Sequence, residues 1–311
     1  MLPLFLFIVC TTFAFSFSVA DSMPFPWTRE LQQSSPAMEG TDVFITQNLL
    51  KRDSSVSASL VADSIYGSET VNAVKSFQAA HKLQVTGNFD AASASALIVC
   101  CSDDDVKDTG FTARSMGYKY KISIPVASNR SVETIGTLFD ADNNILVKFH
   151  ARAHGHRDDG VNYPWPDFGS NPPDDGLNEF TSSGNTVTGL IEIDLNSPES
   201  NAQLYGPWPV NRFVKGISGN AEWILPNIRD GILLHTGNWT TAEHGVFDPL
   251  TMDMPNSSGC VHSHPSEVEA IYKALINIGV EIHENPFSGK NYPFKPQGIA
   301  VVYSSPSVVP E

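Results

Sequence analysis

Positive charge is scarce in this sequence. Lys and Arg number 19 against 34 Asp and Glu, which gives a formal net charge of −15 over 311 residues. Most of such a surface would repel a polyanion, so we expect no nucleic-acid partner. Charged residues make up 17% of the chain and hydrophobic residues 41%, a composition that excludes a disordered protein. The length predicts about two domains.

Long hydrophobic runs are equally scarce, and only Met1–Ala20 forms one. The run ends in small residues that suit a signal peptidase, so residues 1–20 are predicted to be a secretory signal peptide. Its start lacks Lys and Arg, which leaves a membrane anchor as the alternative. No other stretch approaches the roughly 18 apolar residues of a membrane helix. We therefore expect a secreted, extracellular protein with no membrane span after signal cleavage.

Cysteine is also rare, with four in the chain. Loss of Cys10 with the signal peptide leaves Cys100, Cys101 and Cys260, an odd number for an oxidising compartment. Two of the three form a bridge, or the adjacent pair forms a strained vicinal disulfide, or the cysteines are buried free thiols. The sequence also lacks His-Glu-x-x-His, Gly-x-Ser-x-Gly, P-loop and dinucleotide-binding motifs, so none of those enzyme classes is predicted.

Helical spacing predominates from Val43 to Leu97. Helices are predicted over Val43–Leu50, over Ser68–Gln78, and from Asp90 to Leu97, the last two with good N-cap residues. These segments predict a compact unit of three helices over residues 43–98.

The turns of this unit carry a distinctive pattern. An aromatic–Gly turn at Tyr66-Gly67 is followed by a Thr that opens a helix, by Phe77-Gln78 near its end, and by a Gly turn into the last helix. In these features residues 43–98 resemble the peptidoglycan-binding module, a small three-helix domain. The resemblance implies peptidoglycan or its stem peptides as the partner, and therefore a secreted protein that is associated with the cell wall. Residues 100–117 are polar and acidic and are predicted to be a linker.

After Tyr118 the pattern changes from helical to alternating. Short β-branched and aromatic runs, separated by Gly, Pro and Asn, predict strands. One helix interrupts them, opening at Pro265 and ending at Gly279. The predicted fold class is therefore α+β, with a small three-helix module followed by a β-rich domain over residues 118–304. The strands are predicted at Tyr118–Ile124, Ile145–Phe149, Val187–Ile193, Gly231–His235 and Gly298–Tyr303.

A glycine-preceded cysteine lies just before that helix. Cys260 follows Ser257-Ser258-Gly259, and His235 closes an apolar strand upstream. A free thiol has a pKa of about 8.5, and a neighbouring His or a helix N-terminus raises its thiolate fraction. Gly259 allows backbone N–H groups to turn toward a bound carbonyl, as an oxyanion hole requires. Cys260 is therefore the candidate nucleophile and His235 the candidate base.

These residues resemble the L,D-transpeptidase (YkuD-type) catalytic domain, whose mark is a strand-end His followed by Ser/Thr-His-Gly-Cys-apolar-Asn/Arg. Ser257, Gly259, Cys260 and Val261 take their places in that pattern, and His235 takes the upstream one. The resemblance implies acyl transfer through a Cys260 thioester, with release of the terminal D-alanine of a wall tetrapeptide. An amine or water then accepts the acyl group, and both outcomes stay open. No cofactor and no metal are expected.

The sequence departs from the family pattern in three ways. Ser258 stands where the family has a second His, and so takes that place among the predicted catalytic residues. His262 replaces the Asn or Arg that would anchor a substrate carboxylate, so a protonated His262 or Arg229 is expected to anchor it, with Ser257 beside them in the substrate-binding set. The segment between His235 and Ser257 is longer than usual and is predicted to form a lid or loop. It contains His244 and Met252-Asp253-Met254.

Two rival interpretations are kept. His150, His154 and His156, with the pair His262 and His264, have spacings that could suit zinc, although a solvated polar loop is the expectation. The other rival is a catalytically inactive, secreted peptidoglycan-binding protein, idle because of the changes at positions 258 and 262. Trp side chains would either stack on sugars or pack in the core. They are Trp165, Trp208, Trp223 and Trp239.

Overall fold

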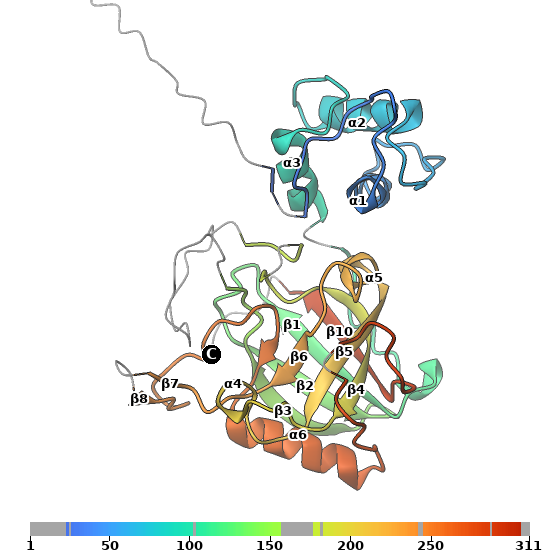
Figure 1. Ribbon diagram of the computed structural model, residues 1–311. Helices are drawn as coiled ribbons and strands as arrows, with labels where there is room; N and C mark the ends of the chain where they lie inside the picture. Colours follow the sequence, from blue (N-terminus) through green and yellow to red (C-terminus); the bar gives the residue numbers. More distant parts are fainter. Residues whose placement is uncertain are drawn as a thin grey trace, which may run out of the picture.

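The computed structural model describes residues 23–24, 26–101, 104–156, 177–180, 183–241, 245–286 and 288–305. The predicted signal peptide, Trp165 and His244 lie outside these residues. Helices come first and a β-rich domain follows (Figure 1), so the predicted α+β fold class is confirmed. None of the helices in the described part of the chain is long and apolar enough to cross a membrane.

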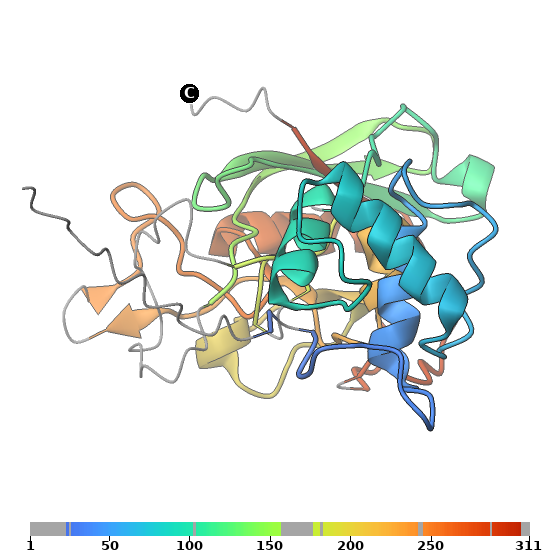
Figure 2. The same cartoon turned by 90° about the horizontal axis from the view of Figure 1, so that it is seen from above.

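Three helices form the N-terminal module, and Figure 2 shows them gathered over the second domain. In the second helix Val74 and Phe77 are buried on one face, as helical spacing predicts. Gln78 ties the following turn, because its Oε1 accepts from the N–H groups of Thr86 at 3.0 Å and Gly87 at 2.9 Å. The Phe-Gln pair of the module pattern therefore packs the core and closes a turn. The helices are α1 (Thr41–Leu50), α2 (Ser68–Ala80) and α3 (Ala91–Cys101).

Both adjacent cysteines lie at the end of α3 and carry free thiols. Successive residues of an α-helix point about 100° apart, so Cys101 faces the core while Cys100 is exposed. Cys260 is likewise a free, buried thiol. Of the alternatives left open by the sequence, free thiols are the one present here, and Cys100 differs from the expectation in being exposed.

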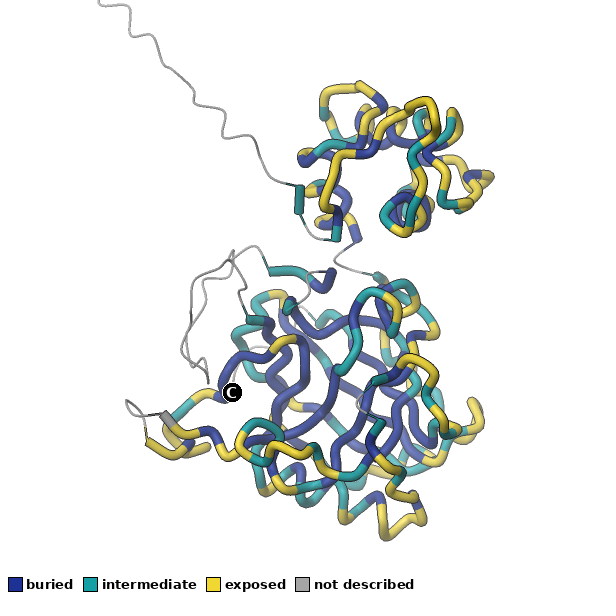
Figure 3. Tube along the Cα trace, viewed as in Figure 1, coloured by how far each residue is buried: buried dark blue, intermediate teal, exposed yellow. Residues whose placement is uncertain are grey.

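The β domain is built on one eight-stranded sheet, in the order β3-β2-β1-β10-β4-β5-β6-β9. β1 and β10 pair in parallel, as do β6 and β9. Figure 3 shows the central strands as the most buried part of the domain. The strands are β1 (Tyr120–Val126), β2 (Thr134–Asp140), β3 (Ile145–Ala151), β4 (Gly189–Asn196), β5 (Val210–Ser218), β6 (Leu233–His235), β9 (Val261–His262) and β10 (Gly298–Ser304), while β7 (Thr240–Thr241) and β8 (Gly245–Val246) form a separate pair.

Three strands of this sheet, β2, β5 and the two-residue β9, differ from the sequence prediction, which left them out. In β5 the charged Arg212 interrupts the apolar pattern that marks a strand. Arg212 is nevertheless buried, and its guanidinium donates to Glu199 at 2.9 Å and to Asn285 at 2.6 Å. A buried charge is tolerated when it is paired in this way. The partners lie on other segments, so this strand becomes recognisable only in three dimensions.

The main helix, α6 (Pro265–Asn277), lies against β3 at the lower edge of the domain in Figure 1. It begins at the predicted Pro265, whose missing N–H costs nothing in a first turn. Glu267 accepts from the backbone N–H of His264 and completes a capping box. The shorter helices were not predicted, because they are too short to show a periodicity. They are η1 (Arg114–Met116), α4 (Ala202–Tyr205) and α5 (Asn220–Ile224).

The described part of the predicted acidic linker packs against the β domain. Asp104 accepts from the Asn220 N–H at 2.9 Å, and the Asn220 amide donates to the Cys101 carbonyl at 2.9 Å. Asp108 pairs with the buried Lys121 at 3.2 Å. These acidic side chains therefore act as hydrogen-bond acceptors at the junction and not as a free, solvated tether.

Candidate active site

The residues predicted for chemistry converge at the ends of β6 and β9. His235 and His262 are register partners across these two parallel strands, so two distant parts of the sequence lie side by side. A cavity of about 250 Å³ opens next to them. Its lining comprises Leu204, Tyr205, His235, Ser257, Ser258, Cys260 and His262.

The turn that presents Cys260 is held by Ser257. Its hydroxyl lies 2.7 Å from the Cys260 carbonyl, to which it donates, and accepts from the Gly259 N–H at 3.0 Å. The Gly259 N–H is therefore occupied, in contrast to the oxyanion role expected for it. Among the described residues no hydrogen bond engages the N–H of Cys260, so this amide could donate to a bound carbonyl oxygen. Ser258 is exposed at the cavity.

Arg229 lies behind this turn and not in the cavity lining. Its two terminal nitrogens donate to four backbone carbonyls, those of Glu179 at 2.7 Å, Asn185 at 2.6 Å, Gly184 at 2.9 Å and Ser258 at 3.1 Å. Burial lowers the pKa of Arg229 to about 10, so the side chain stays charged at neutral pH. The expectation that Arg229 anchors a substrate carboxylate is thus not met, because both of its terminal nitrogens already hold the protein's own backbone and the side chain does not line the cavity.

Gly259 is required where Arg229 approaches the turn. Its φ is +106°, and a Cβ atom built there would lie 1.7 Å from Nη2 of Arg229. No side chain fits in that space, and the left-handed region already disfavours residues with a Cβ. The glycine before the cysteine therefore serves backbone conformation and close packing.

The Cys260 thiol is nearly enclosed. Its Sγ lies 3.7 Å from the Gly231 carbonyl, to which it donates, and 9% of the residue is exposed. Burial raises the pKa of Cys260 to about 11, although the charges of Arg229 and Arg212 act in the opposite direction. The resting sulfur is therefore a neutral thiol and needs a base when it reacts.

His235 has the protonation state that a general base requires. Its Nδ1 lies 2.6 Å from the Thr236 carbonyl, which can only accept, so Nδ1 carries the proton and Nε2 the lone pair. Burial lowers the pKa of His235 to about 4. Thiol and imidazole are thus both neutral at pH 7, so any proton transfer between them would accompany attack by the sulfur and would not precede it.

His262 is buried between His235 and Trp239, with both ring-centroid distances at 4.7 Å. Burial, with a contribution from His235, lowers the pKa of His262 well below its ordinary value. The ring is therefore neutral at pH 7, and the protonated His262 expected to anchor a carboxylate is absent under these conditions. Part of the predicted lid causes this burial, because Trp239 packs with Phe247 and Met254 in a small apolar cluster.

Sequence reasoning missed Tyr205, which lines the cavity with its ring centroid 4.9 Å from that of His235. It ends α4, a helix capped by Asn201, whose side chain accepts from two backbone N–H groups of the first turn. An Asn cap was visible in the sequence, but one turn of helix has no periodicity to support it.

The histidines proposed as a zinc cluster do not form one group: His150 and His264 lie together with Glu267, and no group of potential metal ligands among the described residues contains His154, His156 or His262. His150 contacts Glu267 at 2.8 Å, and His154 is buried with its carbonyl accepting from the Ser257 N–H at 3.0 Å. Trp239 is a core residue with 1% exposure, and Trp208 stacks on Tyr272. The spacing in sequence therefore did not translate into a common ligand sphere.

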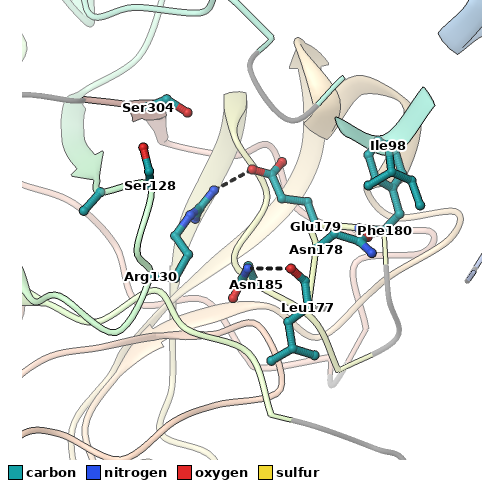
Figure 4. Close-up of a pocket in the computed structure, with 10 residues that line it drawn as sticks. Ile98, Ser128, Arg130, Leu177, Asn178, Glu179, Phe180, Asn185 and Ser304 are labelled. Carbon is teal, nitrogen blue, oxygen red and sulfur yellow. Dashed lines mark hydrogen bonds and ion pairs between the residues drawn. The ribbon is translucent and has the colours of Figure 1, made fainter. Parts of the chain in front are cut away.

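A second cavity, of about 270 Å³, lies where α3 meets the β domain. Figure 4 shows Arg130 and Glu179 pointing toward each other across it, and they pair at 2.6 Å. Glu179 also accepts from the Thr188 N–H at 2.8 Å and from the Asn220 amide at 2.9 Å. The protein itself therefore supplies the partners of the Glu179 carboxylate, and the described residues that line this cavity include no cysteine.

The buried His235 makes folding stability depend on pH. Its folded-state pKa of about 4 lies below the ordinary 6.5, so the unfolded chain takes up a proton first as pH falls. The stabilisation is complete above pH 6.5 and declines by about 3 kcal/mol down to pH 4, at about 1.4 kcal/mol per unit. Urea unfolding at several pH values measures this decline.

The control is His235→Asn, which lacks the titrating group but keeps every carboxylate. Its stability should fall less than that of the unchanged protein over the same interval, with the remaining slope due in part to His262. Parallel curves for the two proteins would contradict a buried neutral His235.

The comparisons with known proteins bear mainly on the first domain. Residues 39–97 match the family model "Putative peptidoglycan binding domain", which confirms the resemblance drawn for the three-helix module. None of the curated proteins compared with the chain matches it.

Two solved structures are similar at a low level. An L,D-transpeptidase from Xylanimonas cellulosilytica DSM 15894 has 17% identity and a TM-score of 0.27, covering 89% of this chain and 100% of its own. A fused Zn-dependent amidase/peptidase/peptidoglycan-binding domain-containing protein from Clostridium acetobutylicum ATCC 824 has 14% identity and a TM-score of 0.23, covering 88% and 99%. Because both TM-scores are low, these two structures carry no argument about the second domain, whose function has to be argued from its own residues.

Proposed function

We propose that this chain is a secreted cysteine acyltransferase that acts on peptidoglycan stem peptides, as an L,D-transpeptidase or an L,D-carboxypeptidase. One observation carries the proposal: Cys260 and His235 line the same cavity. Cys260 lies on the turn that leads into β9, and His235 ends β6, the strand that pairs with β9. The peptidoglycan-binding match over residues 39–97 supports the choice of substrate. We divide the chain into a signal peptide (1–20), the module (43–98), a linker (100–117) and the catalytic domain (118–304).

The first half of the reaction forms a thioester. Nε2 of His235 takes the thiol proton while Sγ of Cys260 attacks the carbonyl carbon that joins the third, diamino residue to the terminal D-alanine. The oxyanion forms beside the Cys260 N–H. The imidazolium returns its proton to the leaving nitrogen, the carbon–nitrogen bond breaks, and D-alanine departs.

The second half resolves the thioester. An amine of another stem peptide, or water, gives its proton to His235 and attacks the same carbonyl, and the sulfur leaves with the proton returned to it. An amine yields a cross-link and water yields the shortened peptide. Both products regenerate the thiol, so no cofactor enters the cycle.

Two buried guanidinium groups, those of Arg229 and Arg212, favour the thiolate form of Cys260. The charges of Arg229 and Arg212 lower the pKa of Cys260 against the larger opposing effect of burial. Because Arg229 also grips the Ser258 carbonyl at 3.1 Å, we assign it as a positioning residue that fixes the turn. A neutral His262 contributes hydrogen bonding and shape to the cavity wall.

The proposal is tested with a disaccharide tetrapeptide as substrate and mass spectrometry of the products. Release of D-alanine, with a cross-linked or a shortened product, supports an enzyme and identifies the acceptor. Retention of the intact tetrapeptide, together with binding to insoluble peptidoglycan, supports the alternative of an inactive binding protein.

His235→Ala should lower D-alanine release at least about a hundredfold, the usual scale for a lost general base. The variant should still bind peptidoglycan, because the module lies on separate helices. Steady-state kinetics on the tetrapeptide provide the measurement. A His235→Ala protein with unchanged rates would place the base elsewhere.

A further inference from the structure

Three side chains with metal-ligating atoms meet on the module, far along the sequence from one another. Asp53 follows α1, His81 ends α2 as its C-cap residue, and Cys100 lies near the end of α3. Their ligand atoms all lie within 4.8 Å of one another. Each helix of the module thus contributes one donor to a single point.

The distances among these atoms suit a soft divalent cation. Sγ of Cys100 lies 3.7 Å from Nδ1 and 3.8 Å from Nε2 of His81, and Nε2 of His81 lies 2.7 Å from Oδ2 of Asp53. Tetrahedral zinc, with bonds of about 2.0 to 2.3 Å, separates its ligands by roughly 3.3 to 3.7 Å. The sulfur–nitrogen separation already fits, and the nitrogen–oxygen pair needs to open by about half an ångström when the metal replaces its shared proton.

The surroundings fix two of the ligands. Oδ1 of Asp53 accepts from the Ser55 N–H at 2.9 Å, which leaves Oδ2 for the cluster. The ring of Phe77 packs on His81 with 4.3 Å between centroids. Such outer contacts are what orients the ligands of metal sites. Cys100 is exposed, so the cluster is open to solvent on one side.

A second nucleophilic site is the weaker interpretation of the same residues. The sulfur is equidistant from both ring nitrogens and so lacks one directed hydrogen bond to a base. Burial, with the nearby Asp53 charge, raises the pKa of Cys100, which opposes thiolate formation in the absence of a cation. Although burial raises the pKa of Asp53, the hydrogen bonds from Ser55 and His81 bring it below its ordinary value, so the carboxylate is ionised.

A second group of potential metal ligands is a poorer candidate for a metal site. His150, His264 and Glu267 also lie within ligand distance of one another. Oε2 of Glu267 accepts from Ser263 at 3.0 Å and from the His150 N–H at 2.9 Å, and the carboxylate caps α6. The two imidazole rings stack at 4.6 Å with only 17° between planes, so one metal cannot lie in both ring planes.

We propose that Asp53, His81 and Cys100 bind one zinc ion, with water in the fourth position, and that the ion links the ends of the three helices. Binding releases the thiol proton of Cys100, and the ring proton of His81 moves to Nδ1 so that Nε2 gives up its hydrogen bond to Asp53 and ligates the ion. No electron is transferred, and the ion adds no step to the acyl-transfer reaction.

The test uses the whole chain, reduced and metal-free, titrated with Zn²⁺ by calorimetry and with Co²⁺ by absorption. We expect one equivalent of tight binding and a sulfur-to-cobalt charge-transfer band. Cys100→Ala should weaken zinc binding at least about a hundredfold and remove the band, and His81→Asn should weaken binding similarly. No binding by the unchanged protein would overturn the proposal.

Two matched variants separate this site from other thiols. Cys101→Ala removes the adjacent buried thiol, and Cys260→Ala removes the thiol beside His235 and His262. Both should retain the stoichiometry, the affinity and the cobalt band. Loss of the band in Cys260→Ala, with retention in Cys100→Ala, would assign the metal to the active-site cavity and refute the site on the module.

Discussion

Cys260→Ala is expected to abolish D-alanine release and thioester formation while the fold stays intact. In the proposed mechanism the sulfur is the atom that bonds to the substrate, and the described residues place no second thiol at the cavity. Removing an active-site nucleophile typically costs about 10⁶-fold in rate, down to background. Intact-protein mass spectrometry after incubation with the tetrapeptide measures the covalent adduct, and product analysis measures turnover.

Cys101→Ala is the matched control, because Cys101 is also a buried thiol, with its pKa raised by burial to about 12. It should retain both the adduct and the turnover. D-alanine release by Cys260→Ala at the rate of the unchanged protein would refute the proposed mechanism. Release absent from every variant, and from the unchanged protein, would instead favour the binding-only function.

Gly259→Ala is expected to destabilise the protein by about 4 kcal/mol or more, the range in which a buried clash places a substitution. The new Cβ would lie 1.7 Å from Nη2 of Arg229 in a residue whose φ is +106°. Relief of the clash requires Arg229 to release part of its grip on four carbonyls. Denaturant unfolding measures the loss, and activity should fall with it because the same turn presents Cys260.

Gly117→Ala is the control for backbone strain alone. Gly117 has a φ of +85°, and no atom lies within 4 Å of the position that an added methyl group would take, so its substitution should cost only about 1 to 2 kcal/mol. Equal losses for the two variants would show that the left-handed conformation, and not the approach of Arg229, explains the glycine before the cysteine.

Hydrophobic periodicity, together with Pro, Gly and capping residues at the ends of elements, was sufficient to predict most of the fold. The helices α2 and α6 have an apolar face, α1 and α3 have helix-compatible apolar runs, and residues at helix ends, such as Pro265 and Gly279, act locally. The β5 strand was missed because Arg212 interrupts its pattern, and the acceptors Glu199 and Asn285 that make its burial tolerable come from other segments. The signal peptide and secretion remain predictions from the sequence.

The candidate site also has features that the sequence predicts and features that only the structure shows. Cys260 and His235 were nominated as nucleophile and base from residue type and local pattern; the structure places both at one cavity, and their roles remain a proposal. The roles of Arg229, His262 and the Gly259 amide were misjudged, since each depends on burial or on a hydrogen-bond partner. Tyr205 was missed because a single helical turn carries it to the cavity.

Features that depend on residues close together in the sequence can be predicted from the amino-acid order alone. They are the α+β class, the peptidoglycan-binding module and the nominated cysteine and histidine. The protonation state of a side chain, and whether its donors are available to a substrate, cannot be predicted in this way. Both depend on desolvation and on hydrogen-bond partners from distant segments. Only the folded chain makes the thiol and both imidazoles neutral and commits Arg229 to the backbone. It also joins Asp53, His81 and Cys100 at one point, which no spacing in the sequence indicates.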